Sequence, residues 1–292
     1  MSSRPLRFGL IGTGYWAAAV HAPGIAAHPQ TELVGVWGRD HSKAATLADR
    51  VGARPFSDVD ELIENVDAVA FSVPPDIQAE LAVRAAEAGR RLLLEKPLAL
   101  TVEAADRIVQ AVRAPTVVFF TSRFDPGISA WFRTEVDSHR WDGGSVLMLA
   151  SIFEPGNPFG RSRWRQERGA LWDIGPHALA LLLPTLGPVE QVAAVRGHRD
   201  EVHLALRHAT GVASSVTLSL TAQAETTEVL FWGESGIARI PDDDGDPAAA
   251  YAASIDALLA GDSRFDADFA RHVVRVLADA DEQLPELGPI VG

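Results

Sequence analysis

Short apolar runs alternate with longer amphipathic runs along the first part of the chain. The apolar runs are "LRFGLI" (6–11), "TELVGVW" (31–37), "DAVAFSV" (67–73), "RLLLE" (91–95) and "TVVFF" (116–120). Continuous hydrophobicity is typical of strands covered on both faces, and segments with helical spacing such as "SKAATLADRVG" separate these runs. The alternation predicts an α/β fold with a doubly wound parallel sheet, which we place in residues 1–121.

The rhythm changes after Thr121, where strand-like runs follow one another with short turns such as "ATG" and "GESG". These runs are "SVLMLASIF" (145–153), "VEQVAAV" (189–195), "EVHLALRH" (201–208), "VASSVTLSLTA" (212–222) and "TEVLFWG" (227–233). Short local connections favour an open sheet that is largely antiparallel or mixed. Helical segments at 247–261 and 265–283 close the chain, so we expect a second α/β domain over residues 122–292.

Composition narrows the possible functions. The 292 residues include no cysteine, which excludes disulfides, thiolate metal sites and cysteine nucleophiles, and no metal site is expected. A net charge of −13 disfavours nucleic acid and anionic membranes as partners. Glycines interrupt the N-terminal apolar stretch, and no run reaches the roughly 20 residues of a membrane helix. We therefore expect a cytoplasmic protein that acts on a small molecule.

The turn after the first strand carries a glycine pattern that is typical of dinucleotide binding. Gly12, Gly14 and Ala17 fit G-x-G-x-x-A between a predicted strand and a predicted helix. The first glycine permits a tight turn, the second lets the backbone approach a pyrophosphate, and the small third residue allows close helix packing. Backbone amides at the helix start would then hold the phosphates.

The end of the second strand bears on which dinucleotide is bound. NAD enzymes usually place an acid there for the ribose hydroxyls, whereas this chain has Gly38, Arg39 and Asp40. A guanidinium can pair with a 2′-phosphate, so NADP is preferred and NAD stays possible. Two alternatives remain open: Arg39 is a surface residue and Asp40 caps the next helix, with Ser42 as a rival cap, or Asp40 is itself the ribose ligand.

The segment "RLLLEKPLAL" (91–100) ends an apolar run on adjacent opposite charges. Glu95 and Lys96 follow a buried strand and precede Pro97. Open α/β sheets bind ligands at the carboxyl ends of their strands. The pair is therefore either part of a ligand site or a charged loop that follows a core strand.

Four motifs together resemble a known family. They are "GTGYWA", "DAVAFSVPPD", "EKP" and the Asp-x-x-x-His pattern of Asp173 and His177. The chain resembles the glucose-fructose oxidoreductase, inositol dehydrogenase and rhizopine-catabolism family (Gfo/Idh/MocA). The resemblance implies an N-terminal Rossmann domain, a C-terminal domain whose sheet forms a homodimer or homotetramer, and a nicotinamide-dependent dehydrogenase or reductase acting on sugars, polyols or related carbonyl compounds.

The resemblance also implies roles for individual residues. Lys96 matches the catalytic lysine, and Glu95 would orient or charge-balance it. His177 would be the general acid or base and Asp173 would orient it, with the choice between Lys96 and His177 as proton donor left open. Alternatively, Asp173 or Gly175 simply caps the following helix. Cofactor contacts are expected at Gly12, Thr13, Gly14, Tyr15, Trp16, Gly38, Arg39, Asp40, Pro74, Glu95 and Lys96.

Two features are specific to this chain. Gln78 stands where many relatives have a histidine, and because an amide cannot carry a proton we assign it no acid–base role. Arg123 at the domain crossover and Trp164 with Arg165 in "GRSRWRQERGALWD" are candidate substrate contacts. The alternative is a solvated basic loop or a subunit contact.

Two other functions compete with the dehydrogenase. The same fold occurs in regulatory proteins that sense a dinucleotide without turnover, although the intact Lys96, Asp173 and His177 disfavour this. A third possibility is an enzyme that uses the nicotinamide transiently during glycoside cleavage.

Overall fold

The computed structural model describes residues 4–241 and 245–288, which form two compact units. The first unit holds the described residues up to Phe124 together with Asp246–Arg271. The second holds the described residues from Asp125 to Gly245 and those from His272 onward. The expected division after Thr121 assigned the whole remainder to one domain, so the grouping of Asp246–Arg271 with the first unit differs from that expectation.

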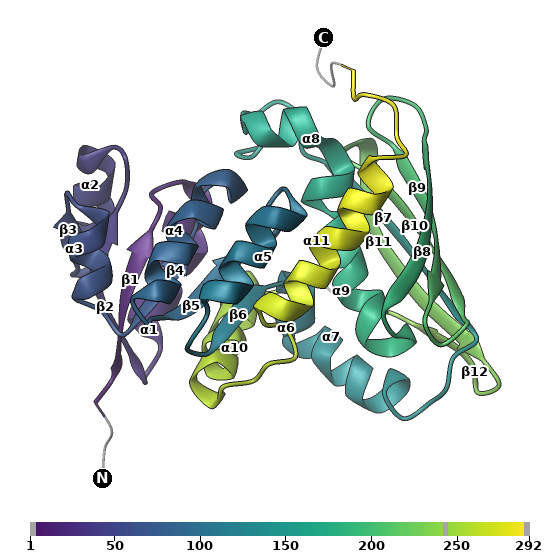
Figure 1. Ribbon diagram of the computed structural model, residues 1–292, viewed down its shortest axis with the longest axis horizontal. Coiled ribbons are helices and arrows are strands. Elements are labelled where there is room, and N and C mark those ends of the chain that lie inside the picture. Colours follow the sequence, from purple (N-terminus) through teal and green to yellow (C-terminus); the bar gives the residue numbers. More distant parts are fainter. Residues whose placement is uncertain (1–3, 242–244, 289–292) are drawn as a thin grey trace. The chain divides into compact units, whose positions relative to one another are not determined.

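The first unit is built on a six-stranded parallel sheet of order β3-β2-β1-β4-β5-β6 (Figure 1). Its strands are β1 (Leu6–Ile11), β2 (Thr31–Trp37), β3 (Arg54–Phe56), β4 (Ala68–Phe71), β5 (Arg91–Glu95) and β6 (Thr116–Phe119). All four residues of β4 and of β6 are buried, which explains their continuous hydrophobicity. The expected doubly wound sheet is thereby confirmed, with β3 as a short addition.

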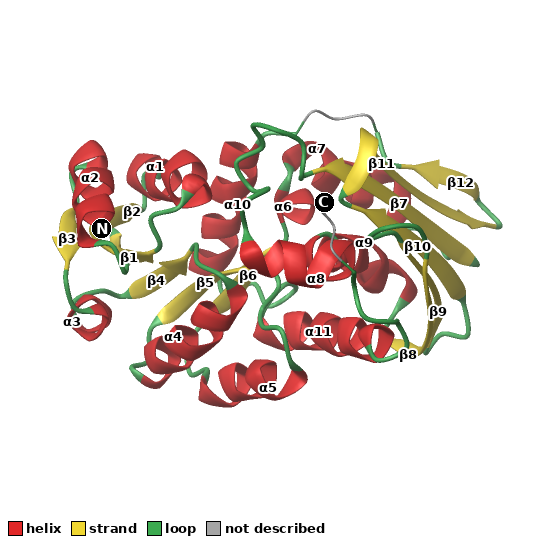
Figure 2. Cartoon of the chain, turned by 90° about the horizontal axis from the view of Figure 1, so that it is seen from above, coloured by secondary structure: helices red, strands yellow, loops and turns green. Residues whose placement is uncertain are grey.

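Helices cover both faces of this sheet (Figure 2). The helix set is η1 (Ala17–His21, a π-helical turn), α1 (Ala22–Ala27), α2 (His41–Val51), α3 (Val59–Glu64), α4 (Pro75–Glu87), α5 (Val102–Ala111), α6 (Thr121–Phe124) and α10 (Pro247–Ala260). Side-chain caps start several of them; the Thr101 hydroxyl, for example, accepts from the Ala104 backbone N–H at the start of α5. Helix α2 ends at Gly52, whose left-handed φ of 71° suits a C-cap.

Helix α10 belongs to the first unit although it follows the second sheet in the chain. It packs against α1, α6 and β6, and its N-terminus is capped by the Asp246 carboxylate, which accepts from the Ala248 N–H. We expected α10 in the second domain because it follows that domain's strands in the chain. A sequence pattern predicts a helix but does not show which elements the helix packs against. The burial of Tyr251 and Ile255 against the first unit decides its place.

The second unit contains a mixed sheet of order β12-β11-β7-β10-β9-β8. Its strands are β7 (Gly143–Ser151), β8 (Val189–Arg196), β9 (Val202–His208), β10 (Ala213–Ser219), β11 (Thr221–Gly233) and β12 (Gly236–Arg239). Only the β7–β10 pair is parallel among the described strand pairs of this sheet, so the expected largely antiparallel sheet is confirmed. Its helices are α7 (Pro126–Trp131), η2 (Phe132–Val136), α8 (Arg163–Asp173) and α9 (Gly175–Leu186), and α11 (Ala267–Asp281) ends in it.

One face of the second sheet is covered and the other is open. Along β9, Val202, Leu204 and Leu206 are buried while the residues between them are exposed. This period of two is typical of a sheet with helices on a single side. Within the described residues, no helix combines the length and the apolar character that crossing a membrane requires.

Candidate active site

The glycine-rich turn has the geometry that its sequence pattern indicates. Gly12 has a φ of 134°, and a Cβ built there would lie 2.2 Å from the Ser72 carbonyl oxygen. At Gly14, by contrast, an added Cβ would have no atom within 4 Å, so the space in front of the helix start is open. Ala17 is fully buried. The turn therefore leaves room for a nucleotide backbone next to the start of the helix, which fits a pyrophosphate.

The residues after β2 are arranged in a way that bears on the ribose. Asp40 caps α2: its Oδ1 accepts from the Ser42 and Lys43 backbone N–H groups at 3.0 and 3.3 Å and from the Ser42 hydroxyl at 2.6 Å. These hydrogen bonds, the Ser42 hydroxyl first, lower the pKa of the Asp40 carboxyl. Of the alternatives left open by the sequence, the structure thus shows Asp40 as the helix cap.

Gly38 is held close to the glycine-rich turn. A Cβ at this position would lie 2.6 Å from the Cγ2 atom of Thr13. An acidic side chain in place of Gly38 would therefore displace Thr13. The sequence lacks an acid at this point, and a side chain there would require the Thr13 side chain to move.

The EKP segment lies at the carboxyl end of β5, on the same sheet edge as Gly12 and Gly38. Trp16 from the glycine-rich turn donates its Nε1 hydrogen to Oε1 of Glu95 at 3.0 Å. The other carboxylate oxygen, Oε2, accepts from the Lys96 backbone N–H at 3.3 Å. The structure therefore joins two motifs separated by 79 positions.

Gln78 is a structural residue of this strand end that sequence reasoning did not assign. Its side chain is fully buried; Nε2 donates to the Glu95 carbonyl at 2.8 Å, and Oε1 accepts from the Glu95 N–H at 2.8 Å. Nε2 also lies within reach of the carbonyls of Pro97 and Leu98. The signal was available, because Gln78 shares a helix face with Ala82 and Ala85, where a polar residue needs a buried partner.

The second unit holds the Asp-x-x-x-His pattern between α8 and α9. Asp173 is 3% exposed and His177 lies in the first turn of α9, where its backbone N–H donates to the Ile174 carbonyl. The N-cap of α9 is Ile174, without a side-chain cap, so Asp173 does not cap this helix. Gly175 is constrained by packing, because a Cβ there would lie 2.9 Å from the Leu277 side chain.

Arg165 is bound to Asp173 rather than projecting toward solvent. Its Nε donates to Oδ2 of Asp173 at 2.9 Å, and the two side chains are 18% and 4% exposed. The guanidinium lies over the rings of Trp164 and Phe159, 4.6 and 5.0 Å from their centroids. An ion pair shielded in this way resembles a built part of a site more than a solvated basic loop.

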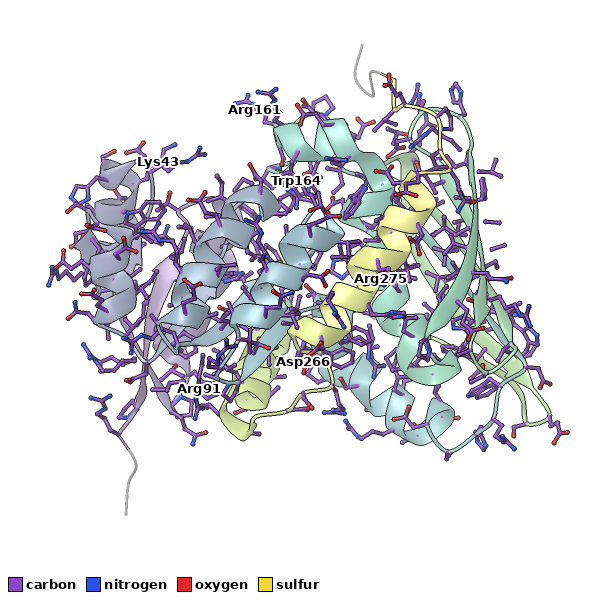
Figure 3. The ribbon with its side chains drawn as sticks, viewed as in Figure 1. Lys43, Arg91, Arg161, Trp164, Asp266 and Arg275 are labelled. Atoms are coloured by element: carbon purple, nitrogen blue, oxygen red, sulfur yellow. The ribbon has the colours of Figure 1, made fainter. Side chains whose placement is uncertain are left out.

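The other basic candidates lie in different surroundings. Arg161 is exposed in the turn before α8, whereas Trp164 within α8 is partly buried (Figure 3). Arg123 is buried in the first unit, with its guanidinium 5.2 Å from the centroid of the Phe265 ring. Tyr15 and Pro74 lie at the carboxyl ends of the parallel strands, on the same sheet edge as Gly12. Tyr15 is exposed, and Pro74 is the N-cap residue of α4. Among the described residues, no group of three or more histidines and acids could hold a metal ion.

Two family descriptions match the chain in order. "Oxidoreductase family, NAD-binding Rossmann fold" covers residues 6–122, and "GFO/IDH/MocA C-terminal domain" covers residues 142–239. A dTDP-3,4-didehydro-2,6-dideoxy-alpha-D-glucose 3-reductase from Streptomyces antibioticus is 29% identical over 254 residues, which are 82% of this chain and 76% of the reductase. Two other curated relatives are matched over about half of their length, 53% and 54%.

Solved structures share the fold across nearly the whole chain. GenD2 from gentamicin A biosynthesis, in complex with NAD, has a TM-score of 0.83 at 21% identity and covers 97% of this chain and 95% of its own. KijD10, a 3-ketoreductase from Actinomadura kijaniata in complex with TDP-benzene and NADP, has a TM-score of 0.76 at 22% identity and covers 97% and 99%. Sequence motifs, sheet order and both matched domains lead to one conclusion: the chain belongs to the Gfo/Idh/MocA family of oxidoreductases.

Proposed function

We propose that this protein is an NAD(P)-dependent dehydrogenase or reductase that interconverts a hydroxyl and a carbonyl group on a sugar, polyol or related compound. The observation that carries the proposal is the contact between Trp16 and Glu95, which joins the nucleotide-binding turn to the strand end bearing Lys96. A glycine-rich turn that binds a dinucleotide would, by itself, also suit a protein that senses the dinucleotide without turnover. A strand end with a lysine directly beside that turn suits chemistry at the nicotinamide.

Each proposed catalytic group has a distinct role. The nicotinamide nucleotide, when bound, supplies or accepts the hydride at the substrate carbon. The Lys96 ammonium donates a hydrogen bond to the substrate oxygen and stabilises negative charge that develops there. The His177 imidazole transfers the hydroxyl proton, since histidine is the side chain that most often serves as a general acid or base, and Asp173 orients it.

We further propose that NADP is preferred over NAD. Gly38 has no side chain to bind both ribose hydroxyls, and the Asp40 carboxylate is engaged as the cap of α2. Arg39 follows directly and is exposed, so its guanidinium can reach a 2′-phosphate. Lys43 projects from the start of the same helix (Figure 3) and adds positive charge.

Replacing Arg39 with alanine should weaken NADPH binding roughly tenfold or more and leave NADH binding unchanged, since only NADPH carries the phosphate that a charged hydrogen bond would hold. Titration with both nucleotides, followed by energy transfer from tryptophan to bound nicotinamide, measures this. Arg50→Ala is the control, because Arg50 is exposed at the far end of α2. Equal loss for both nucleotides would contradict the phosphate role.

The ion pair of Arg165 and Asp173 leads to a second expectation. If Arg165 holds Asp173, Arg165→Met should lower kcat roughly tenfold with little change in the substrate KM. If Arg165 binds substrate instead, KM should rise. Arg163→Met is the matched control, because Arg163 lies on the same helix, is 89% exposed and pairs with Glu167.

The substrate class follows from activity against a defined panel. Purified protein with NADP⁺ or NADPH would be offered myo-inositol, D-glucose, nucleotide-activated hexoses and their keto forms. We expect turnover on at least one sugar-like compound, read at 340 nm as nicotinamide absorbance. Nucleotide binding without turnover across the panel would favour a dinucleotide sensor, and sugar release without net nicotinamide conversion would favour transient redox chemistry.

We propose assembly through the open face of the second sheet, as a homodimer or homotetramer. Ile237 of β12 and its cross-strand partner Trp232 of β11 form an exposed apolar pair at one edge of this sheet, 62% and 38% exposed, and Val195 of β8 is 65% exposed at the other edge. Such residues favour burial in a protein interface. Light scattering of the purified protein would give the number of copies, and a monomer would contradict the proposal.

A further inference from the structure

A buried chain of hydrogen bonds lies behind the EKP strand end. The Tyr251 hydroxyl, on α10, lies 3.0 Å from Nδ1 of His21. The other ring nitrogen of His21, Nε2, lies 2.8 Å from Oε1 of Glu95. Tyr251 and His21 are both 0% exposed, so neither ring is in contact with bulk water. Polar groups buried to this degree are held by their partners, and here those partners lead to Glu95.

The direction of these hydrogen bonds follows from the tyrosine. Burial, and then the charge of Glu95, raise the pKa of Tyr251 well above its ordinary value, so the phenol stays protonated and donates. Among the described residues, the hydrogen-bond partner of this hydroxyl is Nδ1 of His21, so Nδ1 accepts and carries no hydrogen. A neutral imidazole then has its hydrogen on Nε2 and donates it to Glu95.

Glu95 links this chain of hydrogen bonds to Lys96, the proposed catalytic residue. Its Oε1 accepts from His21 and from Trp16, and its Oε2 accepts from the Lys96 backbone N–H. A carboxylate that accepts three hydrogen bonds is fixed in orientation. The Gln78 side chain also hydrogen-bonds the backbone C=O and N–H of Glu95. Both the side chain and the backbone of the residue before Lys96 are therefore held in place.

The surrounding backbone is shaped to admit these two rings. The turn Ala17–His21 is π-helical, with the Ala22 N–H donating to the Ala17 carbonyl, a departure from regular helix that is frequent at functional sites. A Cβ at Gly24 would lie 2.6 Å from Cδ1 of Tyr251, so the glycine makes room for the tyrosine ring. Phe119 packs edge-on against Tyr251 with centroids 5.1 Å apart.

We infer that His21 and Tyr251 are positioning residues for Lys96: they orient the Glu95 carboxylate, which in turn fixes the strand end that presents the lysine. The inference rests on the proposed function, because it concerns how Lys96 is held for that reaction. It also gives α10 a role, since this helix follows the entire second sheet in sequence and delivers Tyr251 to the first unit.

Kinetics test the inference with variants that keep the fold. Tyr251→Phe retains the ring and should lower kcat roughly tenfold with unchanged NADPH affinity. His21→Leu should cost more, and His21→Gln should recover part of the loss, because an amide can still donate to Glu95. Tyr251→Phe should have no further effect in the His21→Leu background, since it acts through that ring. Ser254→Ala, which removes another buried hydrogen bond of α10, should keep wild-type kcat.

A spectroscopic test needs no substrate, because the chain has only two lysines, Lys43 and Lys96. In protein labelled with ¹³C and ¹⁵N at lysine, Lys43→Arg assigns one signal and leaves the other to Lys96. Tyr251→Phe and His21→Leu should shift the Lys96 signal and leave Lys43 unmoved, whereas Ser254→Ala should shift neither. Histidine ¹⁵N spectra should show His21 protonated at Nε2 alone.

The outcomes separate this inference from the proposed function. An unmoved Lys96 signal together with wild-type kcat in Tyr251→Phe would overturn the positioning role and leave the dehydrogenase standing. His21 protonated at Nδ1 would overturn the hydrogen-bond direction on which the inference depends. Failure of the wild-type protein to bind either NADPH or NADH would instead overturn the proposed function, whatever the state of His21.

Discussion

Replacing Lys96 with methionine is expected to lower kcat/KM by on the order of a thousandfold while NADPH affinity and the melting temperature stay at wild-type values. Methionine keeps the length of the side chain but can neither donate a hydrogen bond nor carry charge. The substrate oxygen would lose its charged donor at the carbon that exchanges hydride. Stopped-flow measurement of nicotinamide oxidation with a substrate from the panel, together with nucleotide titration, gives both quantities.

The scarcity of lysine makes the control unusually clean. Lys43, the other lysine, is exposed on α2, with its Nζ 3.9 Å from Oδ2 of Asp40, so Lys43→Met should keep kcat when NADPH is saturating. Acylation of amino groups in the Lys43→Arg protein should inactivate it, because Lys96 is then the sole lysine that can react. Wild-type kcat in Lys96→Met would remove Lys96 from the mechanism and with it the role of the EKP segment.

Gly12→Ala is expected to destabilise the first unit by about 3 kcal/mol, which a folding unit of this size registers as a fall of several degrees in melting temperature. The φ of 134° is outside the range that alanine adopts readily, and the added Cβ would lie 2.2 Å from the Ser72 carbonyl oxygen. Either the turn or β4 would have to move. Circular dichroism on heating measures the loss.

Gly14→Ala is the matched substitution, two positions along the same turn. Its Cβ would meet no atom within 4 Å, so the melting temperature should stay at the wild-type value. Nucleotide affinity should nevertheless fall tenfold or more, since the methyl group would fill the space proposed for the pyrophosphate. A stable Gly12→Ala protein would contradict the turn geometry, and full NADPH affinity in Gly14→Ala would contradict the nucleotide site.

Strands, turns and helix caps could be predicted from the sequence because each depends on residues that are close together along the chain. Continuous hydrophobicity marked β1, β2, β4, β5 and β6, and alternation with helical segments indicated a parallel sheet. The glycine spacing around Gly12 anticipated a turn that the structure shows with positive φ. Asp40 as a cap of α2 was also among the sequence alternatives, because capping requires only the next three residues.

Long-range partners needed the folded chain. The three-residue β3 has too little periodicity to be recognised, and it was not predicted. Gln78 offered a polar residue on a buried helix face, but its partners at Glu95 and Leu98 depend on how α4 packs against β5. Arg165 was a candidate for a substrate contact or a solvated basic loop, and its pairing with Asp173 depends on the fold of α8.

The clearest case is the pair formed by His21 and Tyr251, which are 230 positions apart. Neither residue carries a local signal: one is a histidine in an alanine-rich helix and the other a tyrosine among alanines. Turn residues and the spacing of hydrophobic residues predict helices and strands. Whether α10 packs on the first or the second unit depends instead on which unit buries Tyr251 and Ile255. Sequence pattern thus determined the elements, the glycine-rich turn and the place of the EKP segment at a strand end, and packing determined which distant side chains contact them.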